Sequence, residues 1–250
     1  MIYQFPIIDQ DKLIDLYKET EDPIYLEKEN ERRLTFNSYL ELLKNHLKKN
    51  AKVFEIGSYT GIFLSMLEKE GYSATGLELS KWASSIASRK VAAKIFNEPL
   101  EKISDEWNEV FDAVCLWDVF EHYNYPALEL SHIFKVLKRD GYLFISTVDA
   151  GSFSFRILRG RYPFLMQMHP VYFSRTTISR ILENAGFEIV KIRVHRRYIS
   201  KKYFLNRIKA FFRTDSGFII WIFKAFLSLH KKENILLRGM GLMDVVARKK

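Results

Sequence analysis

The stretch AKVFEIGSYTG, residues 51–61, decides the fold, because a short apolar run ends there in a turn bounded by glycines. The residues that follow, TGIFLSMLEKEG (60–71), have apolar side chains at helical spacing and end on a glycine. A buried strand that leads directly into a helix is typical of a βαβ unit, in which the strands of the sheet run parallel.

The same alternation continues to residue 148. Near-continuous apolar runs such as AVCLW (113–117) predict a sheet that helices cover on both faces. Strands are predicted at 72–79, 91–96, 111–119 and 142–148, with helices at 80–90 and 126–141. A further helix at 174–186 and strands at 187–195 and 241–250 follow.

Segments outside this core have different characters, although the chain is predicted to form a single domain, 1–250. Residues 1–50 are expected to form a helical arm, because apolar side chains recur near a 3.6-residue period between Pro23 and Lys49. Residues 149–173 are aromatic and lack periodicity, which predicts a long loop, and such loops are often functional. Residues 198–238 form a basic, aromatic insertion before the last strand.

The charge of the chain is unevenly distributed. The 250 residues hold 39 Lys+Arg and 30 Asp+Glu, a net charge of +9. Residues 191–250 alone hold 16 basic and 3 acidic residues, so the first 190 residues carry a net charge of −4. This division disfavours a uniformly basic nucleic-acid-binding surface.

Cysteine and hydropathy patterns exclude further classes. A single cysteine, Cys115, excludes a disulfide framework and a cysteine-built zinc site. The N-terminus lacks the pattern of a signal peptide, and no apolar run approaches the roughly 20 residues of a membrane span. We therefore expect a cytoplasmic protein.

The first candidate site follows the opening strand. Gly57 and Gly61 let the backbone approach a ligand closely, and Glu78 ends the next predicted strand, where a carboxylate can accept both hydroxyls of a ribose. This pattern predicts an adenosine-type ligand, although the glycines could simply form a tight turn beside a solvated Glu78. Both a dinucleotide and S-adenosylmethionine (SAM) suit the spacing, but Tyr59 stands where the dinucleotide fingerprint has its second glycine.

The second candidate site, Trp117 to His122, ends the strand at 111–119. Asp118, Glu121 and His122 place two carboxylates and an imidazole where a parallel sheet opens toward a ligand. Histidine can take a proton near neutral pH, and a neighbouring carboxylate can orient it. The alternatives are a helix cap or a Glu121–His122 pair, and three such close oxygen and nitrogen groups are weak grounds for a metal, so none is predicted.

Together these segments resemble the bacterial class I SAM-dependent methyltransferases, in the branch related to the ubiquinone-biosynthesis O-methyltransferases. The resemblance covers nearly the whole chain and is much less specific for the substrate. It is carried by EIGSYTGIFL (55–64), TGLELSKWASSIA (75–87), FDAVCLWDVFEHYNYP (111–126), VLKRDGYLFISTV (136–148), HPVYFSRTTISRILENAGFEIV (169–190), DPIYLEKENERR (22–33) and MDVVARKK (243–250).

The resemblance implies a Rossmann-like α/β fold with a seven-stranded, mostly parallel sheet, an antiparallel last strand and helices on both faces. It implies SAM as the cofactor, with Glu78 on the ribose and Asp118 at the methyl-donor side. The residues that would bind the cofactor are Glu55, Gly57, Ser58, Gly61, Glu78, Leu79, Asn97 and Asp118. Two departures are Tyr59, where many relatives have glycine, and Asp118, where quinone methyltransferases have glutamate.

For catalysis, we expect methyl transfer to a hydroxyl of a small-molecule acceptor or of one linked to a lipid or glycan. His122 is predicted to be the general base and Glu121 its orienting group, with His169 and Tyr172 in the aromatic loop holding the acceptor. One alternative is a nucleic-acid methyltransferase, suggested by the basic last sixty residues. Another is a SAM-binding or scaffold protein without turnover.

The insertion at 198–238 has three interpretations. Basic residues around apolar helical faces suit peripheral contact with an anionic membrane through residues 200–232. The same segment could form a lid over an apolar acceptor pocket, or an interface in a homodimer. Its most apolar part, GFIIWIFKAFLSL (217–229), is too short to span a bilayer.

Overall fold

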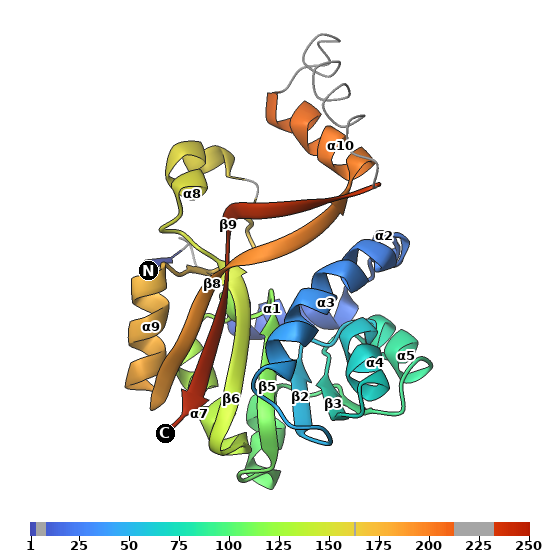
Figure 1. Ribbon diagram of the computed structural model, residues 1–250, viewed down its shortest axis with the longest axis vertical. Helices are drawn as coiled ribbons and strands as arrows, with labels where there is room; N and C mark the ends of the chain where they lie inside the picture. The colour runs from blue at the N-terminus through green and yellow to red at the C-terminus, as the bar shows by residue number, and fades with distance from the viewer. Residues whose placement is uncertain (4–8, 163, 213–232) are drawn as a thin grey trace.

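A computed structural model describes residues 1–3, 9–162, 164–212 and 233–250 of the chain (Figure 1). The described strands form a seven-stranded sheet in the order β4-β3-β2-β5-β6-β9-β8. Strand β9 runs antiparallel to both of its neighbours, and the pairs from β4 to β6 are parallel, which confirms the predicted topology. The strands are β2 (Lys52–Ile56), β3 (Ser73–Leu77), β4 (Lys94–Phe96), β5 (Phe111–Trp117), β6 (Leu137–Val148), β8 (Phe187–Ser200) and β9 (Asn234–Lys249).

Helices cover both faces of this sheet, as predicted, and α4 and α9 lie on opposite sides of it in Figure 1. Alternate side chains of β5 enter two separate cores: Val114 and Leu116 face one, Ala113 and Cys115 the other. The first core is closed by α6 (Leu100–Ile103), α7 (Pro126–Val136) and α9 (Arg175–Asn184). The second is closed by α3 (Glu29–Lys44) and α4 (Ile62–Lys69), and α5 (Lys81–Ser88) lies beside α4.

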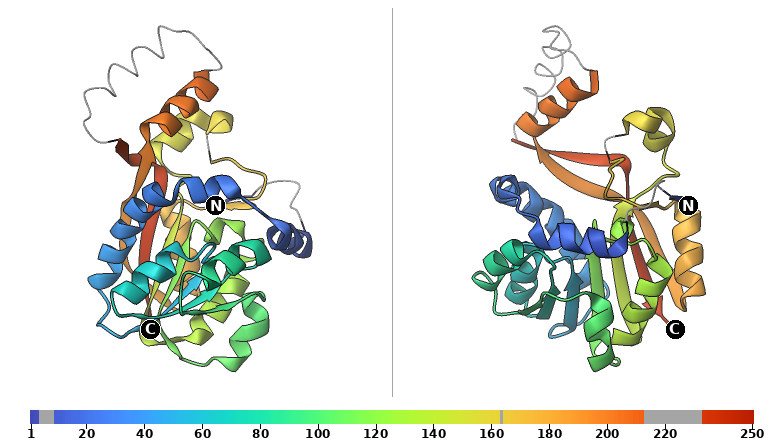
Figure 2. Two further views of the ribbon diagram at one scale, coloured as in Figure 1. Left: turned by 90° about the vertical axis from the view of Figure 1, so that its right-hand side faces the viewer. Right: turned by 180° about the vertical axis from the view of Figure 1, so that it is seen from behind.

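The arm, expected to be helical over residues 1–50, is divided into three helices. It consists of α1 (Gln10–Glu19), α2 (Pro23–Glu27) and α3, which ends at Lys44. Figure 2 shows the arm lying across the end of the sheet, above α4 and α5. The Asp22 side chain accepts the backbone N–H of Tyr25 and so starts α2 as a separate helix. The sequence does not reveal α1, because Leu13 is its one buried residue.

Two connections also differ from prediction. Residues 137–140, expected to end a helix, start strand β6, because buried Leu137 pairs with Phe111. The predicted loop at 149–173 contains α8 (Phe153–Leu158), capped by Ser152, and β7 (Val171–Tyr172), which pairs with β1 (Ile2–Tyr3). These pairings depend on residues distant in the sequence, so a local pattern cannot predict them.

The insertion is shorter than 198–238, because β8 continues to Ser200 and β9 already starts at Asn234. Between them the structure describes α10 (Lys201–Phe212), which projects beyond the body of the molecule (Figure 1). The apolar run 217–229 lies outside the described residues. In the part of the chain that is described, no helix is both long and apolar enough to cross a membrane.

Candidate cofactor and acceptor site

The turn between β2 and α4 brings bare backbone to the end of the sheet. Gly57 and Gly61 have φ angles of 75° and 73°, which favour glycine. A Cβ atom on Gly57 would lie 2.5 Å from Val119 Cγ2, and one on Gly61 would lie 2.9 Å from Ala87 Cβ. Both glycines are therefore required by the geometry of the turn, which leads into the N-terminus of α4.

Glu78 holds this turn in place. Its carboxylate accepts the backbone N–H of Tyr59 and that of Ser80, each at 2.8 Å. Burial raises the pKa of Glu78, although these two N–H groups oppose the shift. Glu78 is thus a buried, oriented carboxylate at the cofactor turn, which removes the alternative of a solvated strand end.

The other predicted cofactor residues surround Glu78. Glu55 is buried, and its Oε2 has no hydrogen-bond partner among the described residues. Asn97 donates from Nδ2 to the Glu78 carbonyl at 2.8 Å, while Leu79 packs against the core. Ser58 instead faces β3, because its N–H donates to the Leu77 carbonyl and its hydroxyl lies beside Gly76. Its role is therefore to fix the turn.

These features fit SAM. The glycine turn admits a ligand close to the backbone, and the carboxylate of Glu78 suits a ribose. Burial raises the pKa of Glu55 well above its usual range, so its unpaired Oε2 suits a hydrogen-bonding group of the ligand, whereas the carboxylate of Asp118, with its lowered pKa, suits the positive charge of the sulfonium and ammonium groups.

Asp118 follows β5 and faces both the cofactor turn and the insertion. It adopts a φ of 58°, and Ser146 Oγ both accepts its backbone N–H and donates to its Oδ1, each at 2.9 Å. Arg197, near the end of β8, forms an ion pair with Oδ2 at 3.7 Å. Burial alone would raise the pKa of Asp118, but the charges of Arg197 and His195 and the Ser146 bond outweigh it and lower the pKa.

His122 is fixed in one tautomer. Its Nδ1 lies 2.7 Å from the Met168 carbonyl oxygen and 2.6 Å from the Tyr17 hydroxyl. A carbonyl can only accept, so Nδ1 carries the hydrogen and Nε2 keeps its lone pair. Burial lowers the pKa of His122, which keeps the ring neutral and able to take a proton. Its orienting partners are Met168 and Tyr17, in place of the predicted Glu121.

Glu121 and His169 belong to the same cluster as His122, and both are uncharged at neutral pH. Burial and the nearby Asp118 raise the pKa of Glu121 to about 8, so it holds a proton at neutral pH. The His169 ring meets that of His122 edge-on at 4.6 Å, and burial lowers its pKa to about 4. Tyr172 lies beyond it at 5.9 Å. The structure therefore brings the three residues predicted to be catalytic, Glu121, His122 and His169, into one cluster after β5.

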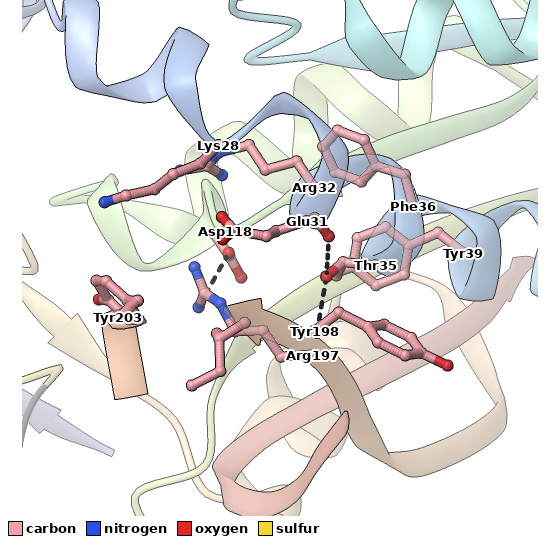
Figure 3. A pocket seen from close by; sticks show the side chains of 11 residues that line it. Lys28, Glu31, Arg32, Thr35, Phe36, Tyr39, Asp118, Arg197, Tyr198 and Tyr203 are labelled. Atoms are coloured by element: carbon pink, nitrogen blue, oxygen red, sulfur yellow. Dashed lines mark hydrogen bonds and ion pairs between the residues drawn. The ribbon is translucent and has the colours of Figure 1, made fainter. Parts of the chain in front are cut away.

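A cavity of about 70 Å³ opens beside Asp118, between α3 and the end of β8 (Figure 3). Its lining side chains come from the arm, the Asp118 turn, the end of β8 and α10: Lys28, Glu31, Arg32, Thr35, Phe36, Tyr39, Asp118, Arg197, Tyr198, Ile199 and Tyr203. Sequence reasoning did not single out Arg32 or Arg197, because only the fold brings the arm and the insertion to one place.

Metal chemistry has no obvious site here. Within the described ranges, no group of three or more His, Cys, Asp or Glu side chains is arranged to hold a metal ion.

The parallel sheet with its antiparallel β9, the glycine turn and the acid after β3 together define a class I SAM-dependent methyltransferase. Residues 26–192 match the methyltransferase domain family, and the chain belongs to that family.

Relatives agree with this assignment. The chain is 25% identical over 126 residues to a ubiquinone biosynthesis O-methyltransferase of Alkalilimnicola ehrlichii, covering 48% of this chain and 50% of the relative. It is 30% identical over 131 residues to a mitochondrial ubiquinone biosynthesis O-methyltransferase of Dictyostelium discoideum, covering 46% and 41%. The chain thus spans half or less of the length of these relatives.

A solved structure shows the same fold with the cofactor bound. Magnesium protoporphyrin IX methyltransferase of Synechocystis with SAM superimposes with a TM-score of 0.58 at 13% identity, over 99% of this chain and all of that one. The fold of this chain is thus one that binds SAM in that protein.

Proposed function

We propose that this chain transfers the methyl group of SAM to a hydroxyl oxygen of a small-molecule acceptor or of one linked to a lipid or glycan. The observation that carries the proposal is the fixed tautomer of His122, which leaves a neutral Nε2 beside the cofactor site. The O-methyltransferase relatives support oxygen as the methylated atom. Asp118, where quinone methyltransferases have glutamate, disfavours a quinone acceptor.

The cofactor would be held by both the core and the arm. Glu78 accepts the ribose hydroxyls, Glu55 hydrogen-bonds the ligand, Asp118 faces the positive charges, and the adenine lies near Leu79 and Asn97. Arg32 has a buried Nε with no hydrogen-bond partner among the described residues, and its charge suits the carboxylate of the methionine moiety.

In the reaction, SAM supplies a methyl group on a positively charged sulfur, open to in-line attack. His122 Nε2 would take the proton of the acceptor hydroxyl as the oxygen bonds to the methyl carbon, while the bond from that carbon to sulfur breaks and S-adenosylhomocysteine leaves. The imidazolium that forms is stabilised through Nδ1–H by the Met168 carbonyl and Tyr17. His169, Tyr172 and protonated Glu121 position the acceptor and exclude water.

A first experiment tests this proposal and its alternatives. The protein is incubated with methyl-labelled SAM and fractionated cell extract, and label is measured in the lipid, glycan, small-molecule and RNA fractions. We expect label outside the RNA fraction, and a loss of about a hundredfold in His122→Ala, as for other general bases. Label confined to RNA would identify a nucleic-acid methyltransferase instead.

Calorimetry separates catalysis from binding. His122→Ala should bind SAM like the wild type, whereas Glu78→Ala should bind it about tenfold more weakly, the cost of hydrogen bonds to a charged group. If His122→Ala turned over as fast as the wild type, His122 would not be the general base. If the protein bound SAM but no fraction became labelled, it would be a SAM-binding protein without turnover.

We also propose peripheral contact with an anionic membrane at the end of the molecule that carries α8 and α10 (Figure 1). On α8, Phe153 and Ile157 are 79% and 60% exposed; Arg156 lies between them, and Arg159 and Arg161 follow the helix in a short 3₁₀ turn. Apolar side chains rimmed by cations suit an anionic lipid surface. Most of residues 200–232, for which this contact was predicted, lies outside the described residues, and a homodimer interface there is the alternative.

A further inference from the structure

The cofactor turn carries an aromatic side chain in a backbone conformation that disfavours one. Tyr59 has a φ of 46°, and its N–H is committed to Glu78 at 2.8 Å. Glycine would adopt this turn without strain. A strained residue beside a binding site indicates that its side chain has a role there.

The Tyr59 ring packs against the arm. Its centroid lies 4.2 Å from that of Tyr25 in an edge-on contact, and Trp82 of α5 flanks it at 6.1 Å. On the other side of Tyr25, the Arg32 guanidinium carbon lies 3.5 Å from the ring centroid. Arg32, Tyr25, Tyr59 and Trp82 thus form a column of side chains in successive contact, from α3, across α2, to the body of the protein.

Tyr25 points toward the residues of the cofactor site. Burial raises the pKa of its hydroxyl to about 12, and the charges of Glu55, Asp118 and Glu78 add to the rise against the effect of Arg32. The Tyr25 ring therefore lies against Tyr59 of the cofactor turn, whose N–H is bonded to Glu78, and within electrostatic reach of the three acids.

The arm is anchored on both sides of Tyr25. Ser80 Oγ donates to the Thr20 carbonyl at 2.8 Å, and the N–H of Tyr198 donates to Thr35 Oγ1 at 3.0 Å. Between these anchors lies α2, a separate helix of five residues. A short helix between two fixed points can move by small changes in its flanking residues.

We propose that Tyr25 is a gate residue of the cofactor site, held closed by Tyr59 and Arg32. SAM enters and leaves only when α2 moves Tyr25 away from Tyr59. The gate concerns the cofactor alone, so it stands or falls independently of the acceptor.

Stopped-flow fluorescence tests the gate, with the tryptophan emission of the intact protein, including that of Trp82 beside the column, as the signal for SAM binding. In Tyr25→Ala and Tyr59→Gly, the association and dissociation rate constants should both rise about tenfold, the factor for losing one aromatic contact. The equilibrium affinity should change far less. Tyr25→Phe, which keeps the ring, and Tyr142→Ala, at the opposite end of the sheet, should match the wild type.

Each outcome has one meaning. Rates within twofold of the wild type in Tyr25→Ala and Tyr59→Gly would overturn the gate. An affinity loss in Tyr25→Ala carried by dissociation alone would also overturn it and make Tyr25 a wall of the bound site. Because Tyr59→Gly relieves the backbone strain, its melting temperature should not fall below that of the wild type. Faster rates in this variant would then not be due to unfolding. Failure of the wild type to bind SAM would refute the proposed function instead.

Discussion

At the scale of single residues, Glu121 shows how burial sets a protonation state. Its folded pKa of about 8 lies above the ordinary value of 4.5, so between these pH values the folded protein keeps a proton that the unfolded chain has lost. The contribution of protonated Glu121 to the free energy of unfolding is therefore fully present below about pH 4.5, and it is lost as the pH rises toward 8.

Glu121→Gln, which cannot ionise, should remove this fall in the free energy of unfolding with rising pH. We expect the free energy of unfolding of the wild type to fall, relative to the variant, by up to about 1.4 kcal/mol per pH unit across this window. Urea unfolding at pH 5.5 and 8.0 measures the difference. Glu106→Gln, which changes an exposed carboxylate, is the control. Parallel pH profiles for wild type and Glu121→Gln would show that Glu121 is ionised in the folded protein.

The candidate site was partly predictable at this scale. Glu78 and the glycines of the turn follow from sequence spacing, because the carboxyl ends of adjacent parallel strands meet. The prediction that Glu121 orients His122 rests on their adjacency in sequence, whereas the groups that lie at hydrogen-bonding distance from Nδ1 are Met168 and Tyr17. Tyr17 reaches His122 across 105 positions, and Arg197 meets Asp118 across 79. No local pattern indicates contacts of this kind.

At the scale of elements, the docking of α3 on β8 links the arm to the core. His195 is 3% exposed at an irregularity of β8, where its Nδ1 lies 2.6 Å from Asp244 Oδ1. The Tyr39 hydroxyl of α3 lies 3.2 Å from the same nitrogen, and Arg193 donates to the Ser38 carbonyl. The irregularity of β8 thus places His195 where it connects α3 to both β8 and β9.

His195→Ala should loosen this connection. We expect a loss of about 2 kcal/mol in the free energy of unfolding, the cost of leaving buried hydrogen-bonding groups without a partner. SAM affinity should also fall, because α3 carries Arg32. His46→Ala, which removes a part-buried histidine bonded to its own helix, is the matched control. Stability lost with full SAM affinity would show that the arm binds the cofactor independently of β8.

Element boundaries explain most of what the sequence could not predict about the fold. Apolar runs and glycine stops locate the β2 to β6 core, since each element there buries a continuous face. The extension of β8 and β9 depends on pairing between residues such as Tyr198 and Leu236, which share no local signal. The apolar period that predicted a helical arm lies largely within α3, so it does not indicate where α1 and α2 begin and end.

At the scale of the whole molecule, the net charge of −4 on residues 1–190 and of +13 on residues 191–250 implies an orientation. An anionic bilayer would attract the basic segment and repel the body, so the end of the molecule that carries α8 and α10 would face the lipid (Figure 1). A lipid-linked acceptor could then reach His122 without crossing water.

Vesicle flotation tests this orientation. Intact protein should float with vesicles containing anionic phospholipid, float less with purely zwitterionic ones, and be released as salt rises from about 0.1 M to about 0.5 M. Arg156→Glu with Arg159→Glu should weaken binding by about tenfold, since each cation near the surface contributes about 1 kcal/mol. Lys48→Glu with Lys49→Glu makes the same charge change before β2, at the other end of the sheet, and should bind like the wild type. Equal flotation of both pairs would show attraction by net charge alone, and no flotation of the wild type would refute membrane contact.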